Sequence, residues 1–310
     1  MKYPLILVMF LLGGTFLIAQ DAHFSQYNAS RIYTNPAFAG TDSTLVLSKA
    51  YRLQWPNING AYRTFYISAD QYVRFLRGGL GFTYLNDNAG GGALITNAIE
   101  INYAPHFEFF DHKMVIQPAI GFGYIQKKLD WSKLTFGDMI DARRGFTSNS
   151  NEIPSSSNKS NMDISAGLLI YTTRFYGGIA AHHLTQPDEG FLGPSQLPRK
   201  ITVHAGANLN FKNFLFSPNI LIMKQKMFQM VLPGITAKYK WAVLALSYRN
   251  GDAFIINPGF QNRFLKIGYS YDFTTSKLTN EITGGTHELQ LTWFLHYQKK
   301  INSIKTLRLI

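Results

Sequence analysis

The chain has 310 residues, no cysteine, 15% charged residues and a formal net charge of +12. These values exclude a disordered chain and a disulfide scaffold, and the length fits one large domain or two small ones. The positive charge indicates contact with anionic lipid headgroups or an acidic partner. Nucleic acid is not an expected partner, because the basic residues are spread singly along the chain rather than gathered on a helix.

The first 19 residues have the outline of a secretory signal peptide. Lys2 precedes an apolar run at residues 5–12, and Ala19-Gln20 follows as the cleavage region. We therefore predict that residues 1–19 are a signal peptide cleaved near Ala19. Leu17 stands where a small residue is preferred, which leaves the cleavage position open by about a residue. The apolar run is too short to span a bilayer as a helix.

Residues 20–42 form a polar, turn-rich segment that ends in the run Asn35-Pro36-Ala37-Phe38-Ala39-Gly40. Asn and Pro favour the start of a turn and Gly permits a positive φ, so this run is not a strand. Phe24, Tyr27 and Phe38 are candidate packing residues within the segment. We interpret it as a possible plug for the domain that follows.

The next part of the chain, residues 43–297, is predicted to be an all-β domain. Residues 200–211 illustrate its pattern, because Ile201, Val203 and Ala205 alternate with Lys200, Thr202 and His204. Side chains in a strand point alternately to opposite faces, so one face of this segment is apolar and the other polar. We predict fourteen such strands, at residues 43–54, 62–72, 78–87, 94–105, 114–126, 163–173, 175–183, 200–211, 214–223, 227–239, 241–249, 253–258, 264–273 and 286–296.

The connections between these strands distinguish a soluble sandwich from a membrane barrel. Long connections, at residues 127–162, 184–199 and 274–285, all follow odd-numbered strands, whereas those after even-numbered strands are short, apart from one of medium length at 106–113. Short periplasmic turns, longer outer loops, strands of about ten residues and an even strand count are typical of outer-membrane barrels. We therefore predict a transmembrane antiparallel β-barrel in the outer membrane, with interfacial aromatic residues such as Trp55, Trp131 and Trp241.

Several motifs resemble the PorP/SprF membrane proteins of the type IX secretion system of Bacteroidetes. They are residues 21–27 (DAHFSQY), 35–40 (NPAFAG), 51–55 (YRLQW), 84–90 (YLNDNAG), 129–138 (LDWSKLTFGD), 182–187 (HHLTQP) and 285–288 (GTHE). The resemblance covers nearly all of the mature chain. Two features depart from the family pattern: a Ser/Asn-rich run at 148–161 and a basic C-terminal tail at 298–310.

The resemblance implies a non-enzymatic role in the secretion or surface attachment of cargo proteins such as gliding adhesins. The implied partners are the C-terminal sorting domain of the cargo and other type IX components, beside outer-membrane lipid. No cofactor is implied. Candidate partner-binding residues come from these motifs and from outer-loop aromatic and charged residues: Asn35, Pro36, Phe38, Arg52, Trp55, Asp87, Asp130, Trp131, Phe136, Asp138, Arg143, Arg144, Phe146, His183, Gln186 and Phe191.

Other functions remain as alternatives. The first is a passive transporter or porin, FadL-like, which a conductance measurement would reveal. A catalytic site is not expected, because no GxSxG nucleophile elbow occurs. A metal site is not expected either, since there is no cysteine and no HExxH, and adjacent His182 and His183 should point to opposite faces of one strand. We further expect that Arg52 can pair with Asp87 across the mouth, and that Arg199 and Lys200 at the rim can attract acidic cargo.

Overall fold

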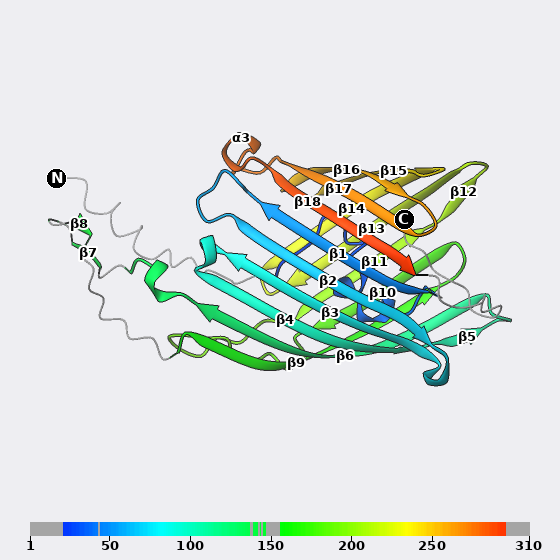
Figure 1. The fold of residues 1–310 in the computed structure, drawn as a ribbon, viewed down its shortest axis with the longest axis horizontal. Helices are drawn as coiled ribbons and strands as arrows, with labels where there is room; N and C mark the ends of the chain where they lie inside the picture. Colours follow the sequence, from blue (N-terminus) through cyan, green and yellow to red (C-terminus); the bar gives the residue numbers. More distant parts are fainter. Residues whose placement is uncertain are drawn as a thin grey trace, which may run out of the picture.

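The computed structural model describes residues 21–42, 44–136, 139–141, 143, 145–146 and 156–295. Within these residues one large sheet is formed by β1 (Leu45–Gln54), β2 (Tyr62–Val73), β3 (Gly78–Ala89), β4 (Leu94–Pro105), β5 (Phe107–Phe109), β6 (Met114–Leu129), β9 (Asn158–Tyr171), β10 (Phe175–His182), β11 (Lys200–Ala207), β12 (Leu209–Phe211), β13 (Phe214–Gln225), β14 (Phe228–Tyr239), β15 (Ala242–Arg249), β16 (Ala253–Gln261), β17 (Leu265–Thr274) and β18 (Thr286–Leu295). Figure 1 shows neighbouring strands lying side by side and running diagonally across the view.

The sheet closes on itself as a barrel with fourteen antiparallel strand positions. We call each position a stave, which is formed by one strand or by two consecutive strands. β4 and β5 both pair with β6 and share one stave, and β11 and β12 both pair with β13 and share another. Closure occurs where β1 pairs with β18, in a register that runs from Leu45 opposite Leu295 to Gln54 opposite Thr286. Closure leaves no strand edge open to lipid, which a membrane-spanning sheet requires. The fourteen predicted strands are therefore confirmed, although β9 begins before residue 163 and β16 continues past Pro258.

Apolar side chains face outward and polar side chains face inward along the staves. In β11, Ile201 and Val203 are 44% and 42% exposed, whereas Lys200 and His204 are 2% and 1% exposed. Outward-facing apolar residues that are exposed to this degree suit contact with acyl chains, while the inward row stays hydrogen-bonded to protein. The predicted orientation of the two faces is thus confirmed.

Connections of very different length lie at the two ends of the barrel. One end, the long-loop end, carries residues 130–157, 183–199 and 275–285, with η4 (Trp131–Lys133), the pair β7 (Ile140–Asp141) and β8 (Gly145–Phe146), and α3 (Asn280–Thr283). The short-turn end carries residues 74–77, with η2 (Arg74–Leu76), and 110–113, 172–174, 212–213, 240–241 and 262–264. In Figure 1 α3 marks the first end, and β5 and β12 mark the second. None of the described helices is long and apolar enough to cross a bilayer.

The N-terminal segment, residues 21–42, contacts the inward faces of staves on several sides of the barrel. It contains α2 (Arg31–Thr34) and η1 (Pro36–Phe38). Ile32, Ala37 and Phe38 pack against Val115, Leu169 and Tyr171 of β6 and β9 in one buried cluster. Tyr27 joins a second cluster with Leu221 and Leu232 of β13 and β14, and Phe24 joins a third with Tyr66 and Leu85 of β2 and β3. The barrel interior beside these clusters is therefore occupied by the chain's own N-terminal residues.

Candidate functional site

Ser25 is the centre of a buried network of charges. Its Oγ donates to Asp272 Oδ2 at 2.6 Å and accepts from Arg52 Nη1 and Arg249 Nη2, each at 2.7 Å. The backbone N–H groups of Ser25 and Gln26 donate to the two oxygens of Glu288 at 2.8 and 3.0 Å. Because Arg52, Arg249, Asp272 and Glu288 come from β1, β15, β17 and β18, one short stretch of the N-terminal segment is tied to four staves around the closure.

Arg52 and its partners form ion pairs within this network. Its Nη1 lies 3.1 Å from Glu288 Oε2 and its Nη2 lies 3.3 Å from Asp272 Oδ2, while Arg249 Nη2 lies 2.9 Å from the same Asp272 oxygen. Asp87 instead accepts a 2.6 Å hydrogen bond from Thr64 Oγ1. The expected pairing of Arg52 with Asp87 is therefore wrong, because Glu288 stands directly opposite Arg52 across the β1–β18 closure, whereas Asp87 is two staves away.

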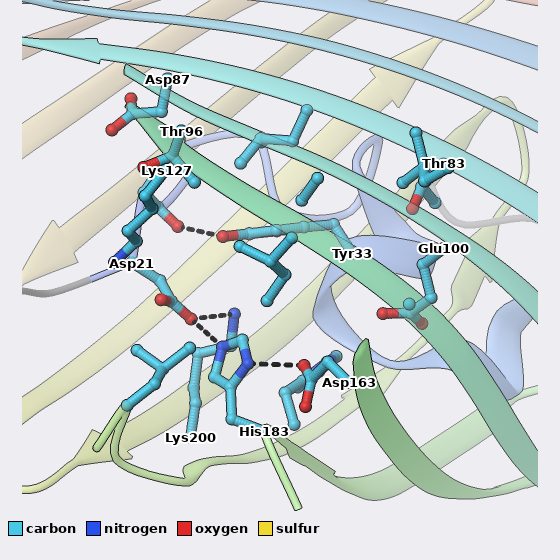
Figure 2. Close-up of a pocket in the computed structure, with 18 of the residues that line it drawn as sticks. Asp21, Tyr33, Thr83, Asp87, Thr96, Glu100, Lys127, Asp163, His183 and Lys200 are labelled. Carbon is cyan, nitrogen blue, oxygen red and sulfur yellow. Dashed lines mark hydrogen bonds and ion pairs between the residues drawn. The ribbon is translucent and has the colours of Figure 1, made fainter. Parts of the chain in front are cut away.

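A second node joins the start of the N-terminal segment to the long-loop end. Asp21 Oδ2 lies 2.7 Å from His183 Nε2 and 2.9 Å from Lys200 Nζ, and the other ring nitrogen of His183 lies 2.7 Å from Asp163 Oδ2. Figure 2 shows these four side chains converging, with Tyr33 beside them. The Lys200 ammonium also sits 4.3 Å from the centre of the Tyr33 ring. A cavity of about 80 Å³ opens next to the node and is bordered by Asp87, Glu100 and Lys127 as well.

Asp21 and His183 stabilise each other as an ion pair outside the strands. Burial opposes the charged form of His183, but the carboxylates of Asp21 and Asp163 outweigh it and raise the pKa of His183 to about 9. Burial likewise opposes the charged form of Asp21, yet His183 and Lys200 hold its pKa well below the ordinary range. The node therefore carries charges of both signs at neutral pH.

The structure corrects two expectations at this node. His183 follows the last residue of β10 and has a φ of 58°, so both His182 and His183 are buried, at 5% and 8% exposure, instead of pointing to opposite faces. Lys200 begins β11 on its inward face and pairs with Asp21, so it is not an exposed rim residue; Arg199 before it is exposed. Among the described residues, no group of three or more His, Asp or Glu side chains is arranged to hold a metal ion.

The Asn35–Gly40 run is held against β9, β10 and β11. Asn35 Nδ2 lies 3.2 and 3.3 Å from the carbonyl oxygens of Leu168 and Ile179 and 3.0 Å from His204 Nε2, and its Oδ1 accepts from the Ala37 N–H. The Phe38 ring lies 4.8 Å from the His204 ring, and Pro36 is buried as the first residue of η1. These motif residues are inside the barrel, so a partner could reach them only if the segment moved.

The other end of this run is fixed by Asp70 on β2. Asp70 Oδ2 accepts from the Gly40 N–H and from Arg31 Nη2, both at 2.9 Å. Gly40 has a φ of 69°, and a Cβ on Gly79 of β3 would fall 1.9 Å from the Ala39 carbonyl oxygen. The two backbones therefore approach so closely that only glycine fits at Gly79.

Three of the predicted loop aromatics gather at the long-loop end. The Trp131 ring stacks on Phe136 at 6.0 Å and meets Phe191 edge-on at 6.2 Å. The Asp130 side chain caps η4 by accepting hydrogen bonds from Ser132, and these hydrogen bonds lower the pKa of Asp130. Together Trp131, Phe136 and Phe191 form what we call the loop aromatic cluster.

The remaining candidates are more scattered. Trp55 meets Tyr62 edge-on at 6.0 Å where β1 ends, Gln186 has a φ of 46° in the 183–199 loop, and Arg143 is exposed. Asp138 and Arg144 lie outside the described residues, as does the side chain of Phe146. The predicted signal peptide and C-terminal tail also lie outside them.

Several solved structures are distantly similar to this chain. Among solved structures, the chain is similar to the CymD monoaromatic hydrocarbon channel, with 11% identity and a TM-score of 0.46 over 87% of this chain and 94% of that one. It is also similar to the KdgM porin, with 10% identity and a TM-score of 0.37 over 81% and 99% of the two chains. A third similar structure is outer membrane phospholipase A from Escherichia coli, with 6% identity and a TM-score of 0.33 over 81% of this chain and 90% of that one. Likenesses this distant carry no argument about activity.

Sequence comparison is more specific than these structural likenesses. No curated protein matches the chain significantly. The model of the family described as "Type IX secretion system membrane protein PorP/SprF" matches residues 17–293, which span the N-terminal segment and the barrel almost to the end of β18. The chain therefore belongs to the PorP/SprF family of type IX secretion system membrane proteins.

Proposed function

We propose that this protein is a non-enzymatic outer-membrane scaffold of the type IX secretion system, which supports the secretion or surface attachment of cargo proteins. Family membership and the closed barrel support its place in the outer membrane and in the secretion machinery. The cargo role goes further and rests on the resemblance to family members that handle gliding adhesins.

The observation that carries a scaffold rather than a channel is the occupied interior. Residues 21–42 are bonded to β1, β2, β9, β15, β17 and β18 through hydrogen bonds and an ion pair. A passive porin needs a continuous aqueous path, whereas these residues bond and pack against inward faces on several sides of the barrel. We propose that the segment acts as a plug, and that cargo is held by surfaces outside the lumen.

The loop aromatic cluster is the surface best suited to such binding. Trp, Tyr and Arg dominate interface energies, because large planar side chains bury much area at a small entropic cost. Trp131 and Phe191 come from loops that follow different staves, so the cluster forms only when the two loops contact each other. We propose that the C-terminal sorting domain of the cargo docks there, with Arg143 and Arg199 attracting acidic residues at the edge.

Replacement of residues 134–155 by a short Gly-Ser linker tests this proposal. The substitution keeps η4 and all of β9, since Leu129 N–H still bonds to the Ser157 carbonyl. We expect the barrel to assemble normally while surface-retained cargo is lost, as measured by cargo immunoblots of intact cells and culture medium.

A matched control replaces residues 276–279 at the same end with a linker of equal length. This control should retain cargo, because those residues lie in a loop that contributes nothing to the loop aromatic cluster. Normal cargo retention after the 134–155 replacement would contradict the proposed docking surface.

A further inference from the structure

Each of the six connections at the short-turn end carries a basic residue. We call six of these residues, one from each turn, the basic rim: Arg74, Lys113, Arg174, Lys212, Lys240 and Arg263. All six are exposed, and none has a carboxylate within ion-pair distance among the described residues. The turns follow every second stave, so the basic rim extends around the barrel instead of forming a patch on one side.

An exposed aromatic side chain accompanies every member of the basic rim. Five of the six have one as a chain neighbour, and Lys113 has Phe110 three residues earlier. The aromatic side chains are between 58% and 85% exposed: Phe75, Phe110, Phe175, Phe211, Trp241 and Phe264. The Lys240 ammonium lies 5.3 Å from the centre of the Tyr239 ring, and the Arg263 guanidinium lies 5.7 Å from that of Phe264. Charge and ring are therefore presented together at the same level of the barrel.

The two ends of the barrel differ sharply in charge. The connections at the short-turn end contain seven basic residues and one acidic residue, Asp111. Those at the long-loop end contain six basic and eight acidic residues. Among the connections, the net positive charge therefore lies at one end of the barrel, which a general requirement for solubility does not explain.

We infer that the basic rim binds the phosphate groups of phospholipids in the leaflet that surrounds the short turns. Basic side chains beside an anionic membrane surface each strengthen binding by about fivefold, and aromatic rings prefer the headgroup level of a bilayer. A docked protein would need neither one aromatic residue for each basic residue nor a repeat around the whole circumference. In the orientation given by short periplasmic turns, this is the periplasmic leaflet.

Native mass spectrometry of the full-length protein tests the inference. Purified protein is exchanged into micelles that contain equal amounts of phosphatidylglycerol and phosphatidylcholine, and the retained lipids are counted. The rim variant carries Arg74→Gln, Lys113→Gln, Arg174→Gln, Lys212→Gln, Lys240→Gln and Arg263→Gln. The control variant changes the six basic residues of the connections at the long-loop end to glutamine: Lys133, Arg143, Arg144, Arg199, Lys226 and Lys277.

We expect wild type and the control variant to retain phosphatidylglycerol in preference to phosphatidylcholine. In the rim variant, the ratio of retained phosphatidylglycerol to phosphatidylcholine should be at least about fivefold lower. Added salt should weaken the preference in the wild type, because it screens the headgroup charge. An unchanged preference in the rim variant, with normal heat-modifiable mobility showing that it is folded, would overturn the inference. So would unchanged lipid retention together with loss of crosslinks to periplasmic proteins, which would assign the basic rim to an acidic protein partner.

Discussion

Arg52 is 1% exposed, and its guanidinium lies between the carboxylates of Asp272 and Glu288. Substitution by methionine would leave Glu288 buried without a cation, and breaking a buried pair in this way costs about 3–5 kcal/mol. We therefore expect Arg52→Met to lower the free energy of unfolding by that amount, as measured by urea unfolding in detergent micelles followed by tryptophan fluorescence.

Arg63→Met is the matched control, because Arg63 is an exposed residue of β2 and its loss should change stability by no more than about 0.5 kcal/mol. The double variant Arg52→Met/Glu288→Gln removes the uncompensated charge and should recover part of the loss. Equal effects of Arg52→Met and Arg63→Met would show that the buried ion pairs contribute nothing to stability.

His183 makes the attachment of the N-terminal segment depend on pH. Its pKa of about 9 in the folded protein lies above the unfolded value of ~6.5. The stabilisation it supplies is therefore complete below ~6.5 and is lost as the pH rises through about 9. Asp21, whose pKa is lowered, loses its contribution only in acid. We expect amides near Asp21 to become less protected in alkaline solution.

Hydrogen–deuterium exchange of residues 21–30, corrected for the intrinsic effect of pH, measures this loss. The wild type should lose protection as the pH passes about 9, whereas His183→Gln should have a flat profile with lower protection at neutral pH. Parallel profiles for the two proteins would argue against a role for His183 in holding the segment.

The fit of the Asn35–Gly40 run in the barrel depends on the absence of a side chain at Gly79. A Cβ on Gly79 would meet the Ala39 carbonyl oxygen, whereas a Cβ on Gly177 of β10 would have its nearest neighbour at 3.6 Å. Overpacking of a rigid contact typically costs about 1–3 kcal/mol. We expect Gly79→Ala to displace the run and speed trypsin cleavage after buried Arg31, while Gly177→Ala leaves the cleavage rate unchanged. Equal rates would mean that the run is held elsewhere.

The elements of the barrel were predictable from the sequence because lipid imposes one rule on every stave. Alternation at period two locates all fourteen strands, and the lengths of the connections predict the orientation in the membrane. The strand ends were less predictable, since His183 leaves the alternation through a positive φ that no local signal marks. A charged residue at an inward position, such as Asp272 or Glu288, predicts a buried partner. Which residue that partner is depends on how the barrel closes.

Ser25 shows why the site itself could not be predicted fully. It lies in a recognisable motif, yet three of its four partners, Arg249, Asp272 and Glu288, are more than 200 residues away in sequence, and the partners meet only when β1 pairs with β18. Asp21 also pairs with residues far away in sequence, His183 and Lys200, and no pattern distinguishes it from other polar residues of the segment. Long-range registers and the path of an irregular segment are set by the whole barrel, so the residues alone indicate a plug without indicating its contacts.

At the scale of the whole molecule, the barrel and the N-terminal segment should be separable. In the part of the chain that the structure describes, no strand pairing involves residues 21–42, so a chain that lacks them should still close through β1 and β18. Its interior charges, such as Asp70 and Glu288, would then face water rather than protein, and hydration would offset part of the lost pairing. We expect this deletion variant to assemble as a heat-modifiable barrel with a lower melting temperature.

Planar-bilayer recording distinguishes the proposed plug from a passive transporter. The wild type should be silent, the variant lacking residues 21–42 should conduct, and a synthetic peptide of residues 21–42 should reduce that conductance, because its contacts with Arg52, Asp70 and His183 can form again. A peptide with Ser25→Ala and Arg31→Met serves as the control, since it lacks two of the polar anchors. Conductance of the wild type equal to that of the deletion variant would reject the plug and favour the transporter, because an aqueous path would then pass the segment in its native position.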